Sequence, residues 1–409
     1  MVDPAPFRAI SLFTGIGGLD YGFEAAGFET AVAIEWDAAC CRVLRENRPW
    51  PVIEDDIHRV GSARILRKAR LTRGAADVLI GGPPCQPFSK SGYWASGDAK
   101  RLSDERADTL TAYLRVLEDT QPRALLLENV YGLAYRGKDE GLGRILNGIR
   151  DINERCGTNY QPRWQVLNAA AFGVPQQRER VFIVASRDGR EFTFPLPTHG
   201  QPDALEKGQD PYRTCWDALG DLPALPNDEA LRAGGKWAEL LPTIPEGENY
   251  LFHTKRGRGL PLFGWRTRYW NFLLKLAKDR PSWTIQAQPG SATGPFHWES
   301  RKLSIHELCR LQTFPDLDID ASRNEAQRML GNAVPSLLAE VLARAIAVQF
   351  LGHAEYGGDP KLLPPLRPKM PPPELTKQVS RPYLALIDDH ADHPGTGLGR
   401  RASLRKTAA

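Results

Sequence analysis

The fold is decided by the stretch Ser11-Leu12-Phe13-Thr14-Gly15-Ile16-Gly17-Gly18-Leu19-Asp20. It ends an apolar segment that predicts a strand over residues 9–13, and it opens a segment that predicts a helix to about Ala26. Glycines at a strand-to-helix turn let the backbone approach a ligand and leave amide N–H groups exposed at the helix start. The pattern is Gly-x-Gly-Gly and not the Gly-x-Gly-x-x-Gly dinucleotide fingerprint, so by itself it is equally compatible with an ordinary tight turn.

Apolar strands and helices alternate from residue 8 to about residue 186. This alternation predicts a parallel sheet with helices on both faces. Glu35 ends the second strand, where an acidic side chain can accept the hydroxyls of a ribose, and Trp36 beside it could cover an adenine. Asp56 and Ile57 follow the third strand. Each acid is also compatible with a solvated strand end.

A proline-rich loop follows the predicted strand 77–80 and reads Gly81-Gly82-Pro83-Pro84-Cys85-Gln86-Pro87-Phe88-Ser89. Proline fixes its own φ and restricts the preceding residue, so this loop presents Cys85 in one direction. A nucleophilic thiolate needs such fixed presentation. The alternative is an incidental cysteine in a proline-rich loop, and the motifs that follow weigh against it.

Two further motifs border predicted strands. The segment Leu125-Leu126-Leu127-Glu128-Asn129-Val130 places a carboxylate at the carboxyl edge of the sheet, where ligands of α/β proteins bind. The segment Val174-Pro175-Gln176-Gln177-Arg178-Glu179-Arg180 places two arginines on one face of an extended chain. Planar guanidinium groups suit the recognition of phosphate or carboxyl groups, although an Arg-Glu-Arg sequence alone is also typical of a solvated edge.

Together these motifs resemble those of the bacterial DNA (cytosine-5)-methyltransferase family of restriction-modification systems. The resemblance covers most of residues 8–350 and rests on six ordered motifs. They are Phe-x-Gly-x-Gly-Gly, Pro-Cys-Gln, Glu-Asn-Val, Gln-x-Arg-x-Arg, the segment from Arg301-Lys302-Leu303-Ser304 to Leu311-Gln312-Thr313-Phe314-Pro315, and Gly331-Asn332-Ala333-Val334-Pro335. We see no departure from the family pattern at a catalytic position.

The resemblance implies an α/β fold, in which a Rossmann-like S-adenosylmethionine-dependent methyltransferase sheet carries a smaller DNA-recognition domain before the C-terminal helix. The expected parts are a catalytic and cofactor-binding large domain at 1–198, a small target-recognition domain at 199–321 with its specificity segment at about 251–298, a return to the large domain at 322–358, and a tail at 359–409. The tail is Pro-rich and basic, so we expect it to be disordered, and from about Lys361 onward dispensable for chemistry.

Three helices in the second half of the chain are predicted from local signals. A short helix is expected near 214–219. Ser304 with Glu307 three residues later forms a capping box, which predicts a helix from Ser304 to Leu311. Proline at a helix start and an amphipathic pattern predict a helix over 335–350.

The family resemblance assigns chemistry to four side chains. Cys85 would add to C6 of the cytosine and make C5 nucleophilic, while Glu128 hydrogen-bonds N3. Arg180 would hold the carbonyl oxygen, and Arg178 would position that group or a phosphate near Cys85. None of these groups can reach a base inside a stacked duplex, so the cytosine must be flipped out.

The resemblance also implies S-adenosylmethionine as the cofactor. It would lie over the glycine loop, with its ribose on Glu35, its adenine between Trp36 and Ile57, and its adenine amino group near Asp56. The expected cofactor-binding residues are Phe13, Gly15, Gly17, Gly18, Leu19, Glu35, Trp36, Asp56, Ile57, Pro84, Asn332 and Ala333. No plausible cluster of metal ligands is evident, and the chemistry needs no metal.

Residues 251–302 carry ten lysines and arginines against two acids, interleaved with nine aromatic residues. This pattern is typical of a surface that follows phosphates and contacts bases, although it also fits a solvated basic face over a small aromatic core. The expected DNA contacts are Gln86, Ser89, Arg256, Arg258, Arg266, Arg268, Thr284, and additionally Lys275 and Lys278.

The composition is that of a globular protein of about two domains, with 409 residues, 42% hydrophobic and 25% charged. Six cysteines without Cys-x-x-Cys spacing argue against a zinc ribbon or a disulfide framework. We find no signal peptide and no apolar run long enough to cross a membrane, so we expect a cytoplasmic, nucleoid-associated protein.

The expected partner is double-stranded DNA, bound by a monomer, with a possible cognate restriction endonuclease that acts on the same site without a required complex. Two alternatives stay open. One is an RNA cytosine-5 methyltransferase built on the same catalytic domain. The other is a nicotinamide oxidoreductase with a Rossmann-type sheet, which leaves Pro-Cys-Gln and Gln-x-Arg-x-Arg unexplained.

Overall fold

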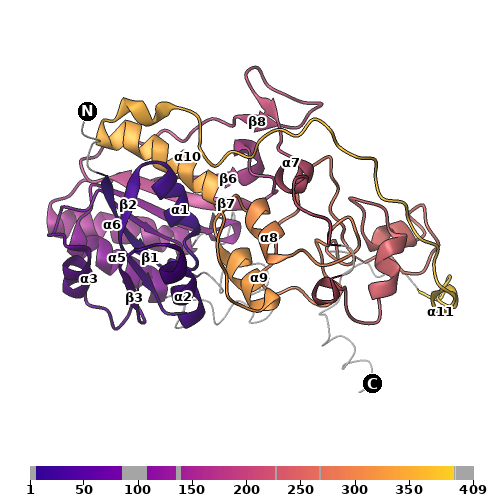
Figure 1. The fold of residues 1–409 in the computed structure, drawn as a ribbon. Coiled ribbons are helices and arrows are strands. Elements are labelled where there is room, and N and C mark those ends of the chain that lie inside the picture. Colours follow the sequence, from indigo (N-terminus) through magenta and orange to yellow (C-terminus); the bar gives the residue numbers. More distant parts are fainter. Residues whose placement is uncertain are drawn as a thin grey trace.

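The structure is a computed structural model that describes residues 6–84, 108–134, 140–225, 228–266, 269–390 and 392. Its centre is a seven-stranded sheet in the order β3-β2-β1-β4-β5-β7-β6 (Figure 1). The strands are β1 (Phe7–Leu12), β2 (Phe28–Glu35), β3 (Val52–Glu54), β4 (Val78–Gly81), β5 (Ala124–Val130), β6 (Arg163–Asn168) and β7 (Glu179–Ser186). Strands β1 to β5 pair in parallel, whereas β7 is antiparallel to both β5 and β6.

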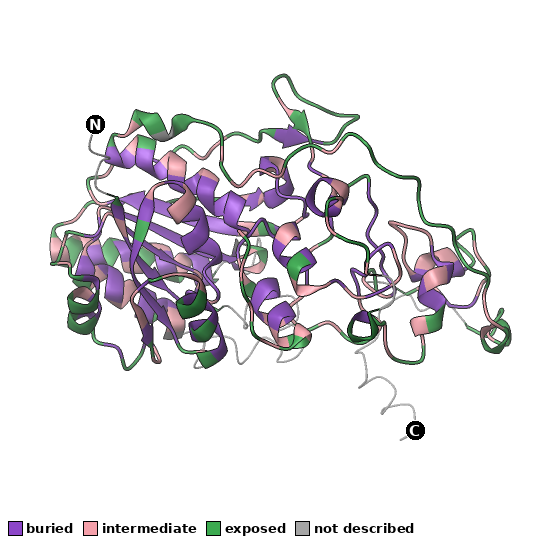
Figure 2. Cartoon of the chain, in the orientation of Figure 1, coloured by how far each residue is buried: buried purple, intermediate pink, exposed green. Residues whose placement is uncertain are grey.

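Helices cover both faces of this sheet. They are α1 (Gly18–Ala25), α2 (Ala38–Asn47), α3 (Ser62–Ala69), α5 (Asp108–Thr120), α6 (Glu140–Cys156) and α10 (Ser336–Ile346). The alternation of side chains in β5 divides the core between the two faces: Leu125 and Leu127 pack with α5 and α6, whereas Leu126 packs with α1 and α10. Both faces are buried (Figure 2), as is expected for parallel strands.

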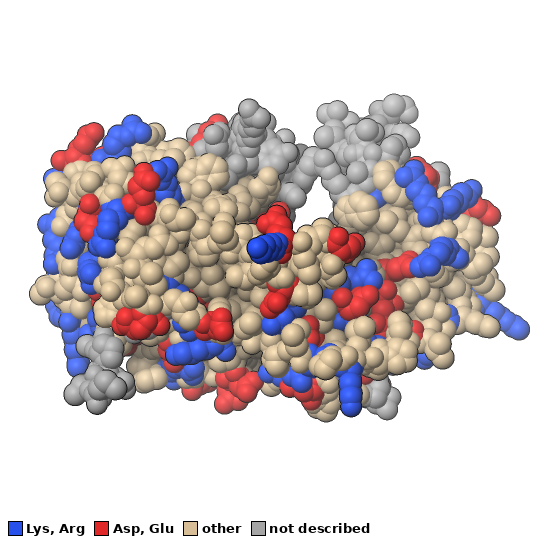
Figure 3. All heavy atoms as spheres, turned by 90° about the horizontal axis from the view of Figure 1, so that it is seen from above, with Lys and Arg blue, Asp and Glu red and all other residues tan. Residues whose placement is uncertain are grey.

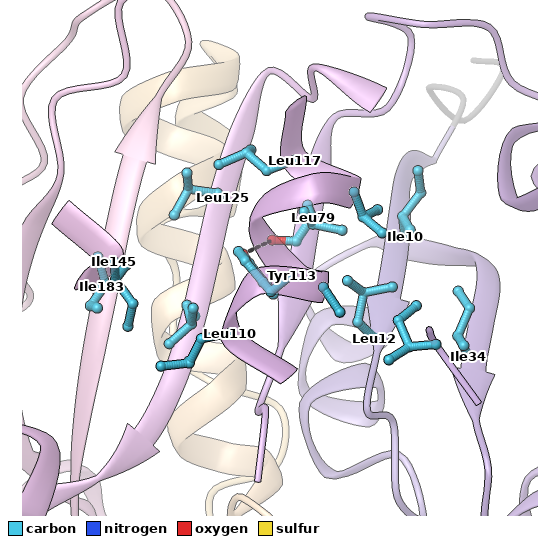
Figure 4. Close-up of a cluster of buried hydrophobic side chains, with 14 of the residues drawn as sticks. Ile10, Leu12, Ile34, Leu79, Leu110, Tyr113, Leu117, Leu125, Ile145 and Ile183 are labelled. Atoms are coloured by element: carbon cyan, nitrogen blue, oxygen red, sulfur yellow. Dashed lines mark hydrogen bonds between the residues drawn. The ribbon is translucent and has the colours of Figure 1, made fainter. Parts of the chain in front are cut away.

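The core on the α5 side contains two buried, hydrogen-bonded tyrosines, Tyr113 and Tyr160. Tyr113 projects from α5 toward the sheet among aliphatic side chains of the strands (Figure 4). Its hydroxyl lies 3.2 Å from both the Leu79 and the Leu126 carbonyl oxygens. A buried phenol needs such a partner, so this contact fixes α5 against β4 and β5, the two strands that carry the candidate catalytic loops.

The chain returns to the sheet after a long excursion. Helices α8 (Ile305–Leu311) and α9 (Arg323–Asn332) lead into α10, which packs against α1. By length and composition, the stretch Arg323–Leu351, which comprises α9, α10 and η9, could cross a membrane, although no apolar run of that length was expected from the sequence. Because 72% of its apolar window is buried, this stretch is accounted for as a core helix of the protein.

Short elements make up most of the excursion. They are β8 (His199–Gly200), β9 (Asp210–Pro211), α7 (Cys215–Leu219) and the 3₁₀ turns η6 (Glu229–Leu231), η7 (Ala238–Thr243) and η8 (Tyr250–His253). The remaining short elements are η4 (Tyr131–Ala134), η5 (Ala169–Phe172), η9 (Ala347–Leu351), η10 (Ala354–Gly357) and α11 (Arg381–Leu384). A separate apolar cluster, the small core, is formed by Leu240, Leu241, Ile244, Tyr250, Leu262, Phe263, Leu273 and Phe296.

The expectation that the tail is disordered is wrong for residues 360–390. This segment runs from α10 across α7 to the small core, where it ends in α11 (Figure 1). Its backbone amides bind carboxylates far away in the sequence, as at Lys361 and Leu362 on Glu340. Polar contacts therefore order a segment that has too few apolar residues to form a core of its own.

Candidate active site

The glycine loop lies at the carboxyl end of β1. Phe13, Gly15 and Gly17 all have positive φ values, of 54°, 57° and 86°, so the turn uses the left-handed region that glycine adopts readily. A Cβ on Gly15 would meet no atom within 4 Å, which leaves that side of the loop open. A Cβ on Gly18, by contrast, would clash with the Val334 carbonyl oxygen. Gly18 therefore permits the close approach of the segment after α9.

Glu35 organises this loop from the end of β2. Its Oε2 accepts the Gly15 N–H at 2.7 Å, and its Oε1 accepts those of Trp36 and Asp37, each at 2.9 Å. Burial raises the pKa of Glu35, and these backbone N–H groups oppose that effect. Oε1 already accepts two hydrogen bonds, whereas Oε2 accepts one and can accept one more. The carboxylate can therefore bind one ribose hydroxyl, where the sequence predicted that it would bind both.

The other expected cofactor residues differ in how far they are exposed to solvent. Trp36 is 76% exposed and stands at the edge of the loop, and Pro84 and Asn332 are also exposed. Leu19 and Ile57 are buried in the sheet core, so they shape the site from beneath. The Asp56 carboxylate accepts the His58 N–H at 3.0 Å, and Ala333 caps α9. In the described residues, no group of three or more His, Cys, Asp or Glu could hold a metal ion.

A buried ion pair lies at the end of β5. Arg180 Nε is 3.0 Å from Glu128 Oε1, and only 15% and 10% of the two side chains are exposed. Burial raises the pKa of Glu128, and the neighbouring Arg180 and Arg178 partly offset this effect. The same burial lowers the pKa of Arg180. The pair can therefore present a carboxyl group and a guanidinium group side by side to a bound ligand.

The root of the proline-rich loop rests on this pair. A Cβ on Gly82 would come within 2.8 Å of Glu128 Oε2, so a glycine is needed where the loop crosses the carboxyl group. Asn129 Nδ2 donates to the Pro83 carbonyl oxygen at 3.1 Å, and Thr109 Oγ1 donates to that of Pro84 at 3.3 Å. Cys85, Gln86 and Ser89 follow immediately and lie outside the described residues.

Arg178 is buried and binds the backbone. Its Nη2 donates to the Gly331 carbonyl oxygen at 2.9 Å, and its Nη1 lies 3.5 Å from that of Ile285, whereas Nε has no hydrogen-bond partner among the described residues. Burial lowers its pKa well below the ordinary value. The guanidinium group thus joins β7 to the start of the segment that holds Asn332, and its predicted role near Cys85 stays a prediction.

Sequence reasoning gave Gln176 no role, although it is the first residue of the Gln-x-Arg-x-Arg motif. This side chain is fully buried. Its Oε1 accepts the Ile285 N–H at 3.1 Å, and its Nε2 lies 3.4 Å from the Leu311 carbonyl oxygen. Gln176 therefore connects Ile285, in the expected specificity segment, and the end of α8 to the residues that precede β7.

The expected DNA contacts differ in their availability. Arg256 stacks over the Trp265 ring at 4.1 Å and lies 3.4 Å from Asp392, and Arg258 pairs with Glu248. Arg266 is exposed, and Arg268 lies outside the described residues. The Thr284 hydroxyl donates to the Gln177 carbonyl oxygen at 2.6 Å, so only its acceptor capacity is left for a ligand.

The assignment of Lys275 and Lys278 as DNA contacts is wrong. Both residues are 3% exposed. Lys275 Nζ donates to the Ile244 carbonyl oxygen at 3.0 Å, and burial lowers its pKa to about 8. Lys278 pairs with Glu246 and with Glu374. These cations hold the small core together, so neither reaches the surface where DNA would bind.

On the face seen from above, the described charged side chains do not form one continuous basic patch (Figure 3). Seen from above, basic side chains appear toward both ends of the molecule and are interspersed with acidic ones (Figure 3). The arrangement of the glycine loop, the buried Glu128–Arg180 pair and the proline-rich loop is therefore more specific than the charge pattern.

Comparison with known proteins agrees with this arrangement. The family model described as C-5 cytosine-specific DNA methylase matches residues 7–348. The chain is 38% identical over 377 residues to the Type II methyltransferase M.SacI of Streptomyces achromogenes, which covers 85% of this chain and 94% of the relative. It is 34% identical over 353 residues to the Type II methyltransferase M.NgoFVII of Neisseria gonorrhoeae, which covers 85% of this chain and 88% of the relative.

A solved structure shares the fold. The crystal structure of a putative DNA modification methyltransferase encoded within a prophage of E. coli matches with a TM-score of 0.59 and 21% identity, over 85% of this chain and all of that one. The family match spans most of the chain, and the curated relatives exceed 30% identity over nearly their full length. The chain therefore belongs to the C-5 cytosine-specific DNA methylase family and is a DNA (cytosine-5) methyltransferase.

Proposed function

We propose that the enzyme methylates C5 of a flipped-out cytosine within a specific double-stranded DNA sequence, through a covalent bond between Cys85 and C6. The methyl donor of the family is S-adenosylmethionine, and we assign it to this chain. The observation that carries the proposal is the buried Glu128–Arg180 pair at the root of the loop that leads into Cys85.

Cytosine needs activation because its aromatic ring makes C5 a poor nucleophile. Addition of the Cys85 thiolate to C6 converts C5 into an enamine-like carbon. A protonated Glu128 would donate a hydrogen bond to N3, and Arg180 would donate to the carbonyl oxygen as charge develops there. The raised pKa of Glu128 supports this role, because burial favours the neutral carboxyl group.

The steps balance without an external oxidant or reductant. The Cys85 sulfur forms a bond to C6, and the electron pair that this releases onto C5 forms the new bond to the methyl carbon. S-adenosylmethionine would supply that methyl group from its sulfonium, whose bond to the methyl carbon would break with the electron pair left on sulfur, giving a neutral thioether. C5 then loses a proton, and its electron pair restores the ring as the bond between sulfur and C6 breaks.

The glycine loop fits the cofactor. The open side of Gly15, the remaining acceptor position on Glu35 Oε2 and the exposed Trp36 ring lie at the end of β1 and β2. Glu35 would orient the ribose through one hydroxyl, and Trp36 would cover the adenine. The segment Asn332–Ala333 would close the site from the α9 side.

The biological role forms part of the same proposal. The curated relatives M.SacI and M.NgoFVII are both named Type II methyltransferases. We therefore assign the enzyme to the modification half of a restriction-modification system, acting as a monomer on cytoplasmic, nucleoid DNA. Any cognate endonuclease would share the target sequence without a required complex. Methylation of RNA is the alternative that the same chemistry allows.

The decisive test replaces the nucleophile. Cys85→Ala should abolish methylation and leave S-adenosylmethionine binding largely intact, because Cys85 contacts the base and not the donor. Cys156→Ala, which changes a half-buried cysteine on α6, is the matched control and should keep its activity. Bisulfite sequencing of DNA from a host that expresses each variant identifies both the product and the target.

A mechanism-based probe tests the covalent step. A duplex with 5-fluorocytosine at the target should trap the wild type as a stable adduct, since fluorine cannot leave as the proton does. The Cys85→Ala variant should form no adduct. Turnover by that variant would refute the proposed nucleophile, and methylation of RNA in place of DNA would favour the alternative substrate.

A further inference from the structure

Residues 360–390, here called the C-terminal strap, lie outside the region that the family model matches, which ends at residue 348. The strap follows η10, passes α7 and reaches α11 at the far end of the molecule (Figure 1). Its outer course is largely exposed (Figure 2). Its inner contacts are nevertheless specific, and they occur at four successive places.

The first contact is with a buried carboxylate on α10. Glu340 has no exposed surface. Its Oε1 accepts the Lys361 N–H at 2.7 Å and its Oε2 accepts the Leu362 N–H at 2.9 Å, while Arg344 Nη2 pairs with it at 2.8 Å. Leu362 and Leu363 then pack against the core shared by α1 and α10. The beginning of the strap is thus fixed to the catalytic part.

The second contact is with α7 and the residues beside it. Arg213 Nε donates to the Pro364 carbonyl oxygen at 3.0 Å. Arg367 makes two contacts: its backbone N–H donates to Asp217 Oδ1 at 2.8 Å, and its side-chain Nη2 pairs with Asp221 Oδ2 at 2.8 Å. The strap is therefore held halfway along its course as well as at its start.

The third contact is with a buried cation of the small core. Lys278 Nζ lies 3.2 Å from Glu374 Oε1 and 3.3 Å from the Pro372 carbonyl oxygen, and it also pairs with Glu246. The Glu374 N–H donates to Glu246 Oε1 at 2.8 Å. The strap thus supplies two of the oxygens around a charge that would otherwise be short of partners in the interior.

The fourth contact is with the expected specificity segment. Val379, Tyr383 and Leu386 pack on the small core. Beyond them, Asp388 lies 3.2 Å from Lys255 Nζ, and just past the strap Asp392 Oδ1 accepts the Trp265 N–H at 2.7 Å. The end of the strap therefore reaches the part of the chain that carries Arg256, Arg258 and Arg266.

We propose that the C-terminal strap positions the specificity segment relative to the catalytic site, so that the cytosine to be methylated is chosen correctly. This proposal rests on the proposed function. Proline-rich segments are stiff and extended, so the run between the second and third contacts acts as a spacer of set length. Glu340, the partner at the first contact, lies on α10, and Lys278, the partner at the third contact, lies within the expected specificity segment; both are buried charges.

The test cuts the spacer without removing any residue that makes a contact. A site-specific protease sequence is inserted between Pro368 and Lys369, which are both exposed, and the folded, purified full-length enzyme is then cleaved. The matched control carries the same insertion after Arg400. We expect the cut spacer to lower kcat/KM on cognate DNA by about tenfold, because a covalent link maintains a high effective concentration of its two ends.

Three readouts decide the outcome. Affinity for S-adenosylmethionine should be unchanged after cleavage, since the cofactor site lies on the sheet, and methylation of near-cognate sites should rise relative to the cognate site. Unchanged kcat/KM and unchanged site choice after complete cleavage would overturn the proposal. Loss of cofactor affinity in parallel with activity would also overturn it, because the strap would then only maintain the fold.

A point variant provides a second, milder test. Glu374→Gln removes the strap's charge from Lys278 with little change in shape and should raise KM for DNA several-fold more than it lowers kcat, whereas Glu355→Gln on η10 should change neither. An unchanged KM for DNA would contradict the proposal. Methylation by the intact enzyme is measured before any cleavage. If the intact enzyme methylates no DNA at all, the proposed function fails, and the proposal about the strap is not the cause.

Discussion

At the scale of single residues, Glu128 lies under two opposing influences. Burial raises the pKa of its carboxyl group, and the guanidinium groups of Arg180 and Arg178 lower it, with burial dominating. A carboxyl group in this setting accepts a proton more readily than an exposed glutamate does. Its protonated form is the one that can donate a hydrogen bond to a ring nitrogen.

Replacing either member of the pair should slow chemistry more than binding. For Glu128→Gln and Arg180→Ala we expect a loss of about 3 kcal/mol of transition-state stabilisation, comparable to the loss of one oxyanion-hole donor, and therefore about a hundredfold lower kcat. The dissociation constant for DNA should change little. Glu179→Gln, at the exposed position between the two arginines, is the control. Equal losses in affinity and in rate, measured by single-turnover kinetics, would mean that the pair mainly binds the substrate.

Asp20 is a buried acid that supports the glycine loop from below. It has no exposed surface and accepts hydrogen bonds from Ser11 Oγ and Thr30 Oγ1, each at 3.0 Å, and Ser11 Oγ is also 3.0 Å from Thr14 Oγ1. Burial raises its pKa from 3.8 to about 6 in spite of these bonds. The folded protein therefore holds a proton there that the unfolded chain has already lost at pH 5.

This difference predicts a pH-dependent stability. The contribution of Asp20 is fully present below its unfolded pKa and is lost as the pH rises through the folded value of about 6. About two pKa units correspond to about 3 kcal/mol. The free energy of unfolding of the wild type, minus that of Asp20→Asn, should therefore fall by this amount between pH 4 and pH 7 in urea titrations. Parallel pH profiles for the two proteins would contradict the assignment.

At the scale of elements, the contact between α1 and α10 returns the end of the chain to the sheet. A Cβ on Gly22 of α1 would lie 2.5 Å from the Cβ of Ala339 and 2.6 Å from the backbone nitrogen of Glu340. The two helices therefore touch through their backbones at this point, and Gly18 repeats this close approach one turn earlier, against Val334.

Gly22→Ala should consequently destabilise the protein, by about 1–3 kcal/mol, because the helices must move apart. Gly143→Ala in α6 is a matched control, since a Cβ there would meet nothing within 4 Å. That control should gain about 0.5–1 kcal/mol from the higher helix propensity of alanine. Chemical denaturation of the two variants and the wild type measures the expected decrease and the expected increase in the free energy of unfolding. A Gly22→Ala variant as stable as the wild type would show that the helices are free to separate.

Capping residues and apolar periodicity in the sequence correctly predicted three helices in the second half of the chain. The capping box of Ser304 with Glu307 is present at the start of α8, Thr214 caps α7, and the helix expected over 335–350 appears as α10 followed by η9. The one antiparallel strand of the main sheet was not predicted. Strands β6 and β7 are joined by a short connection, which allows only antiparallel pairing, whereas parallel strands need a longer crossover.

Long-range partners explain the remaining errors. Lys278 looks like a surface cation in a basic segment, yet its partners Glu246 and Glu374 lie 32 and 96 residues away along the chain. The strap has a composition typical of disorder, yet distant carboxylates such as Glu340 and Asp217 bind its backbone amides. Composition within a window cannot report such pairs. The glycine loop and the Glu128 motif were recognisable because each is contiguous in sequence.

At the scale of the whole molecule, residues 251–298, the proposed specificity segment, are bound both to the residues before β7 and to the C-terminal strap. Arg178 and Gln176 bind Ile285 within this segment, while Asp388 of the strap and Asp392 just past the strap bind Lys255 and Trp265. Several of its cations are already paired within the protein, as Arg256 is with Asp392. Binding of DNA phosphates at Arg256 or Lys255 would therefore compete with the acidic end of the strap.

Exchange of residues 251–298 with the corresponding segment of a relative should move the methylated sequence, provided that Lys275 and Lys278 are retained to keep the small core intact. Arginines that read guanine edges discriminate by about 1–3 kcal/mol each, so the new segment should change the target by more than tenfold in preference. Bisulfite sequencing of host DNA reports the site for the parent and the exchanged enzyme. Glu355→Gln on η10 in the parent is the control and should leave the target unchanged, because this residue lies outside both the exchanged segment and the strap. An exchanged enzyme that stays active on the parent site would place recognition elsewhere, in the loop that follows Cys85 or in the part of the chain before residue 251.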